Sequence, residues 1–153
     1  MATTMQGNPP ELTSGPQAAY RTLGAEAAEY FRPIEKARPY PEGFYLLEEG
    51  HSSAGVFLLL SGRVKLGVRT RRGTELPLEV AGAGELLGLS ACVSGRPYEL
   101  TARTVTACEA IFIPRESFLQ FLRERPHACM EMVRLLSNDL DAAYERIRHL
   151  RRH

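Results

Sequence analysis

Residues 56–70, VFLLLSGRVKLGVRT, place two short runs of apolar residues on either side of a glycine. In the second run, Val64, Leu66 and Val68 occupy every other position, as in a strand with one buried face. Similar short runs, separated by glycine-bearing turns, recur over residues 43–114. Because short strands at nearly regular spacing are typical of all-β folds, the sequence predicts an antiparallel β-barrel or roll.

Helices are expected on both sides of this β region. The first 22 residues are rich in Pro, Gly, Ser and Thr without an amphipathic period, so we expect a flexible arm. A short helix is expected over residues 23–31 and another over residues 115–125, and Pro126 is a favourable first residue for a longer helix. The expected organisation is an arm over 1–22, a β-roll domain over 23–125 and a long helix over 126–153.

The long C-terminal helix carries the clearest periodic signal in the chain. Its apolar residues recur at alternating intervals of four and three, which is the a/d pattern of a coiled-coil seam. The seam residues are Cys129, Val133, Leu136, Leu140, Ala143, Ile147 and Leu150. A helix over residues 126–153 is about 42 Å long at 1.5 Å per residue, longer than a small barrel can cover. We therefore expect a parallel homodimer through this helix, with packing on its own domain as the alternative.

Residues 84–102, GELLGLSACVSGRPYELTA, contain a candidate ligand-binding cassette. Gly84 and Gly88 allow the backbone to approach a ligand closely, and the VSGRP tract then turns the chain toward another strand. Backbone N–H groups can face an anion in such a loop. The candidate ligand-binding residues are Gly84, Glu85, Gly88, Leu89, Ser90, Arg96, Tyr98, Glu99 and Thr101. The alternative is a structural loop that fills the mouth of the barrel.

This cassette, with GVFLLLSGRVKL before it and TACEAIFIPRESFLQFL after it, resembles the cyclic-nucleotide-binding domain of the Crp/Fnr family of bacterial transcription regulators. The resemblance covers roughly residues 23–153. It implies a mainly β domain with flanking helices, an antiparallel double-stranded β-helix (jelly roll or β-roll), followed by a long dimerisation helix. In that family a helix-turn-helix DNA-binding domain follows the helix. The resemblance places that domain after residue 153, so we expect no specific DNA binding by this chain alone.

The family cassette reads approximately G-D-x-x-G-E-L, followed by R-[ST]-A, where the second acidic residue binds the ribose hydroxyl and the arginine binds the cyclic phosphate. By this resemblance Glu85 matches the first acidic position, whereas the ribose position falls on Leu89 and the arginine position on Tyr98. An unpaired phosphate in a partly dry pocket costs on the order of several kcal/mol. We therefore expect no tight binding of cyclic AMP, unless Arg96 or Arg103 supplies the charge. The alternative is that both arginines are solvated surface charges.

Three cysteines, Cys92, Cys108 and Cys129, form no C-x-x-C pair and leave an odd count, so a disulfide framework is not expected. Some Crp/Fnr relatives hold an iron–sulfur cluster through N-terminal cysteines, and here the first cysteine is at position 92. Cys108 and Cys129 fit core or seam positions. Cys92, inside the cassette, is the one candidate for redox activity.

The sequence contains no recognisable set of catalytic residues. The histidines are scattered without an H-x-H pair, whereas a cupin-type metal site needs clustered histidines with a carboxylate. There is also no G-x-S-x-G elbow and no P-loop. We expect neither a metal site nor an enzyme, and a small cupin-like β-barrel enzyme remains the alternative function.

The composition excludes other classes. A net charge of +1 lacks the excess of positive charge that is typical of nucleic-acid-binding proteins. No apolar run reaches the roughly 18 residues that span a bilayer. Without a signal-peptide pattern at the N-terminus, the expected location is the cytoplasm. We expect an effector-sensing and dimerisation module of the Crp/Fnr type with an altered nucleotide pocket. No cofactor is assigned, and a small-molecule effector of unknown identity remains open.

Overall fold

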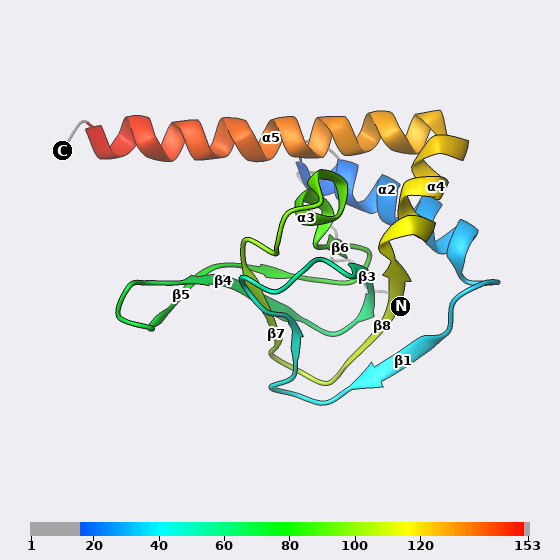
Figure 1. Cartoon of the computed structure of the whole chain (residues 1–153), viewed down its shortest axis with the longest axis horizontal. Coiled ribbons are helices and arrows are strands. Elements are labelled where there is room, and N and C mark those ends of the chain that lie inside the picture. The colour runs from blue at the N-terminus through cyan, green and yellow to red at the C-terminus, as the bar shows by residue number, and fades with distance from the viewer. Residues whose placement is uncertain (1–15, 152–153) are drawn as a thin grey trace, which may run out of the picture.

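The computed structural model describes residues 16–151, with side chains described for residues 22–150. Figure 1 shows how the helices and strands of this part of the chain are arranged. In chain order the elements are α2 (Pro16–Phe31), β1 (Ala37–Tyr40), β2 (Tyr45–Leu47), β3 (Gly55–Ser61), β4 (Val64–Arg69), β5 (Glu75–Ala81), β6 (Leu86–Leu87), α3 (Leu89–Ser94), β7 (Thr101–Thr104), β8 (Cys108–Pro114), α4 (Arg115–Glu124) and α5 (Pro126–Arg151).

The strands form two four-stranded antiparallel sheets, with the orders β1-β8-β3-β6 and β2-β7-β4-β5. Most successive strands lie in opposite sheets, so the chain winds back and forth between the two layers. This arrangement is a jelly roll. The predicted antiparallel roll followed by a long helix is therefore confirmed.

Strand β3 is buried on both faces, which explains its unbroken apolar sequence. Val56 and Leu58 belong to a hydrophobic cluster under the helices, whereas Phe57 and Leu59 belong to a second cluster between the two sheets. The two sets separate because successive side chains of a strand point to opposite faces. Strand β3 thus joins the two parts of the core.

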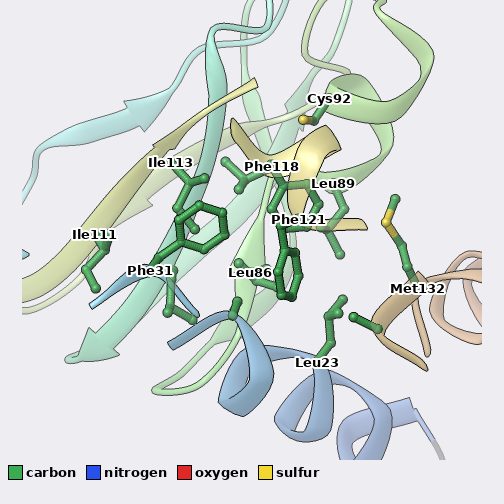
Figure 2. Close-up of a cluster of buried hydrophobic side chains, with 14 of the residues drawn as sticks. Leu23, Phe31, Leu86, Leu89, Cys92, Ile111, Ile113, Phe118, Phe121 and Met132 are labelled. Carbon is green, nitrogen blue, oxygen red and sulfur yellow. The ribbon is translucent and has the colours of Figure 1, made fainter. Parts of the chain in front are cut away.

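The cluster under the helices fixes α2, α4 and α5 against the roll. Phe31 of α2, Phe118 and Phe121 of α4 and Met132 of α5 converge with β-strand residues in Figure 2. The rings of Phe31 and Phe121 lie 5.4 Å apart between centroids. Burial of a side chain of this size contributes about 1.5–3 kcal/mol, so the cluster holds the start of α5 firmly in place.

The two halves of α5 have different surroundings. Ala128 and Leu135 in the first half are buried, whereas Leu140 and Ile147 in the second half are 52% and 53% exposed. Among the elements that the structure describes, no other helix lies beside this second half (Figure 1). Apolar side chains of α5 therefore remain in contact with water in the single chain.

The N-terminal boundary differs from the expectation. Helix α2 begins at Pro16, so the expected limit between arm and domain at residue 22 lies inside a helix. The helix begins earlier because Pro16 is a favourable first helical residue and the two alanines after Gln17 have high helix propensity. The remainder of the expected arm lies outside the described residues.

Candidate functional site

A cavity of about 770 Å³ lies where the β4–β5 hairpin, the cassette and α5 meet. Its volume falls in the range of small-molecule sites. The lining residues are Leu66, Leu78, Glu79 and Val80 from the hairpin, Glu85, Leu86, Leu87, Gly88, Leu89, Ser90, Glu99 and Leu100 from the cassette, and Leu136, Asn138, Asp139, Ala142, Ala143 and Arg146 from α5. A molecule bound there would contact both the β-roll and the long helix.

The structure divides the candidate ligand-binding residues into two groups. Those that line the cavity are Glu85, Gly88, Leu89, Ser90 and Glu99. Those outside its lining are Gly84, Arg96, Tyr98 and Thr101. The first half of the cassette thus faces the cavity, whereas most of the second half belongs to the surrounding fold.

The glycines and Glu85 shape the loop that closes one side of the cavity. Gly84 and Gly88 have φ angles of 92° and 93°, in the left-handed region that favours glycine. The Gly82 N–H donates to the Glu85 carboxylate at 2.8 Å, and the Leu59 N–H donates to the Glu85 carbonyl at 2.9 Å. This loop is therefore tied to strand β3.

Tyr98, the residue that the resemblance to Crp/Fnr regulators places at the family arginine, makes contacts within the fold. Its side chain is 7% exposed, and its hydroxyl donates to the Gly55 carbonyl at 2.8 Å. The Gly55 N–H donates back to the same hydroxyl at 3.3 Å. Because both partners belong to the start of β3, Tyr98 anchors the cassette to that strand and directs no polar group to a ligand in the cavity.

The two arginines considered as replacements for the missing charge also lie outside the lining. Arg103 is partly buried; its Nε donates to the Gly43 carbonyl at 3.2 Å, and its guanidinium lies 5.0 Å from the centroid of the Tyr45 ring. Arg96 is exposed, and its backbone N–H donates to Ser94 Oγ at 3.3 Å. Among the described lining residues, Arg146 of α5 is the one with a cationic side chain.

Acidic groups outnumber basic groups around the cavity. Glu79, Glu85, Glu99 and Asp139 line it together with Arg146, which leaves three negative charges in excess among the described residues. The rest of the wall is mostly leucine, valine and alanine. An apolar wall with excess negative charge disfavours an anion, because like charges repel most strongly where water is scarce.

Several lining residues were not among the sequence candidates. Leu78, Glu79 and Val80 come from β5, and Asp139 and Arg146 come from α5. Positions 139 and 146 are one heptad apart and next to the seam, so the sequence places them on the same side of the helix. Nothing in the β5 sequence marks its contribution, because the hairpin reaches the cavity only through the folding of the roll.

The predicted seam also divides between two surroundings. Leu136 and Ala143 are partly buried and line the cavity. Cys129 is exposed, and the other four seam residues have large exposed fractions. These are Val133 (53%), Leu140 (52%), Ile147 (53%) and Leu150 (73%).

Cys92 lies in the core beneath the cassette. It is fully buried, and desolvation raises the pKa of its thiol to about 11, an effect that the nearby Arg115 guanidinium offsets only in part. The Arg115 Nε donates to the Cys92 carbonyl at 2.6 Å. Because the thiolate is the reactive form, burial suppresses reaction of Cys92 at neutral pH.

In the described part of the chain, no three His, Cys, Asp or Glu side chains gather in a group that could hold a metal ion. Over the same residues, no helix combines the length and the apolar character needed to cross a membrane.

Comparison with known proteins places residues 37–125 in a match to the family described as "Cyclic nucleotide-binding domain". A CRP-like cAMP-activated global transcriptional regulator from Mycobacterium tuberculosis is 26% identical over 116 residues, which are 76% of this chain and 50% of the relative. The cyclic AMP receptor protein of Thermus thermophilus is 28% identical over 124 residues, which are 81% of this chain and 57% of the relative. The chain thus spans about half the length of these relatives.

Solved structures share the fold. The Thermus thermophilus catabolite activator protein superposes with a TM-score of 0.72 at 23% identity, over 95% of this chain and 61% of that one. The sensor domain of the transcriptional regulator DNR from Pseudomonas aeruginosa gives a TM-score of 0.65 at 19% identity, over 84% of this chain and 93% of that one. In the second match, the shared fold covers nearly the whole of a sensor-domain structure.

Proposed function

Because this chain belongs to the cyclic nucleotide-binding domain family, as its resemblance to Crp/Fnr regulators predicted, we propose that it is the effector-sensing and dimerisation part of such a regulator. The observation that carries the proposal is the cavity closed jointly by the cassette and α5. A ligand in that cavity contacts the helix proposed to form the dimer, so binding can bias the arrangement of two subunits. The named relatives are regulators, and the alternative of a cupin-like enzyme finds no support in them.

The exposed row on α5 supports a homodimer. Val133, Leu140 and Ile147 are seven residues apart and each about half exposed. Contiguous exposed apolar residues on a helix mark an interaction surface, and a seven-residue period matches that of a parallel coiled coil. The proposed dimer covers this row with its own copy. The absence of specific DNA binding by this chain alone stays a prediction.

Cross-linking of Cys129 tests the parallel orientation. Equivalent positions of a parallel coiled coil lie opposite one another, so the two copies of Cys129 are expected to meet near the start of the seam. Cys129 is exposed, whereas Cys92 and Cys108 are buried. A short bismaleimide is therefore expected to convert most of the native protein to a covalent dimer on a denaturing gel. Cys129→Ser should remove that product; efficient labelling of Cys129 without cross-linking would contradict the parallel arrangement.

Cyclic AMP is expected to bind weakly at best. The family positions for ribose and phosphate hold Leu89 and Tyr98, and the hydroxyl of Tyr98 is already bonded to Gly55. Each 1.4 kcal/mol of lost interaction reduces affinity tenfold, so loss of two contacts of about that size predicts a dissociation constant roughly a hundredfold above that of a protein that keeps both contacts. Isothermal titration calorimetry measures it, with the Thermus thermophilus cyclic AMP receptor protein as a positive control. A sub-micromolar constant would show that the assignment of these two positions is wrong.

A further inference from the structure

We propose that the cavity binds a small organic cation, that is, a molecule with an apolar body and a protonated amine. This inference rests on the proposed function, because it names the class of effector for the same cavity. Three features support it: the apolar wall, the charges around that wall, and the placement of Arg96 and Arg103 outside the lining.

The apolar part of the wall sets the body of the ligand. Leu78 and Val80 of β5 are 46% and 56% exposed, and they face a cavity whose other side includes Leu136 of α5. Leu100 adds a further apolar side chain from the cassette. Covering such surface releases about 25 cal/mol per Å², so an aromatic or aliphatic body gains affinity from contact with these residues.

The charges around the wall set the head group. Glu85 and Asp139 already take part in interactions within the chain. Glu79, on β5, and Glu99, just before β7, line the cavity and are both exposed at its edge. An ammonium group that leaves water on entering the cavity needs a carboxylate partner, and these two lining residues offer carboxylates from two different segments of the wall.

The cassette and its neighbour Arg103 place no cationic side chain in the cavity to pair with an anion. The side chain of Arg103 is engaged with the Gly43 carbonyl and the Tyr45 ring, and it does not line the cavity. Arg146 is one guanidinium among four lining carboxylates. A phosphate or carboxylate ligand would meet net repulsion there, whereas the same field attracts a cation.

Three probes that share one body separate charge from hydrophobicity. They are 4-phenylbutylamine, 4-phenylbutan-1-ol and 4-phenylbutyrate, titrated by calorimetry into the full chain at pH 7. The amine is expected to bind at least about tenfold more tightly than the carboxylate, with the alcohol between them. Added salt is expected to weaken binding of the amine and to leave binding of the alcohol nearly unchanged.

Matched variants locate the effect. Glu79→Gln combined with Glu99→Gln is expected to reduce the preference for the amine over the alcohol by about threefold to tenfold. Glu109→Gln, at an exposed position of β8 and outside the cavity lining, is the control and should leave the preference unchanged. Ala142→Trp, at an exposed position of α5 that lines the cavity, should abolish amine binding while circular dichroism stays native.

Each outcome bears on a different claim. If the carboxylate or cyclic AMP binds as tightly as the amine and Ala142→Trp abolishes that binding, the cavity is a sensor site but the preference for a cation is overturned. Amine binding that survives Ala142→Trp places the site elsewhere and also overturns the inference. If neither the three probes nor cyclic AMP bind, the cation site is overturned and the sensing role loses support, although the Cys129 test of the dimer still stands by itself.

Discussion

Leu140→Glu is expected to convert the protein from a dimer to a folded monomer. Leu140 is 52% exposed in the single chain, lies at the centre of the exposed row on α5 and does not line the cavity. In a parallel dimer it would meet its own copy, so the variant places two carboxylates opposite each other in an apolar seam. Truncation to alanine at such a seam position already costs on the order of 2–5 kcal/mol, and a buried like-charge pair costs more.

Multi-angle light scattering at tens of micromolar measures the mass, and circular dichroism reports whether the roll remains folded. Leu140→Met is the matched control, because it keeps the volume and apolar character of the side chain and should remain dimeric. A native protein that is monomeric at this concentration, or a Leu140→Glu variant that is still dimeric, would show that the row on α5 has a different partner.

The strands could be predicted from sequence because the local order of apolar and polar residues reflects which of their faces are buried. The unbroken apolar run of β3 corresponds to a strand with both faces buried, and β4 pairs with β5 and β7 as an inner strand of its sheet. The apolar row of α5 could also be predicted from sequence, since Val133, Leu140 and Ile147 recur every seven residues and are all exposed. The pattern of apolar residues predicts a helix or strand correctly when that element has a single apolar face or is buried on all sides.

The cavity was harder to predict because its wall is assembled from separate elements. The heptad pattern assigns Leu136 and Ala143 to the same seam as Leu140, yet in the fold they line the cavity. The helix period gives an angle around the axis but not the position of the β4–β5 hairpin beside it. Tyr98 illustrates the same difficulty. The family's cassette pattern predicts a ligand-binding position there, whereas the hydrogen bonds of Tyr98 with Gly55 become visible only once β3 and the cassette are placed together.

Gly24→Ala is expected to destabilise the protein although it adds a good helix former to a helix. Gly24 lies in α2 at a buried position, and a Cβ there would overlap the carbonyl oxygen of Gly84 and lie 2.9 Å from its carbonyl carbon. At an unhindered helix position the same change stabilises by roughly 1 kcal/mol. Here the obstacle is backbone, so α2 or the Gly84 loop must move, and we expect a net loss of about 1–3 kcal/mol or more.

Thermal and urea unfolding followed by circular dichroism measure the loss, at one fixed protein concentration because dimerisation contributes to apparent stability. For a chain of this size, 1 kcal/mol corresponds to a shift of about 2–4 °C in Tm. Ala25→Ser, at the exposed neighbouring position on α2, is the control and should change stability by less than about 0.7 kcal/mol. Because Gly84 opens the loop that closes the cavity, Gly24→Ala should also weaken binding of the amine probe. A variant that is as stable as the native protein would show that α2 does not approach the cassette this closely.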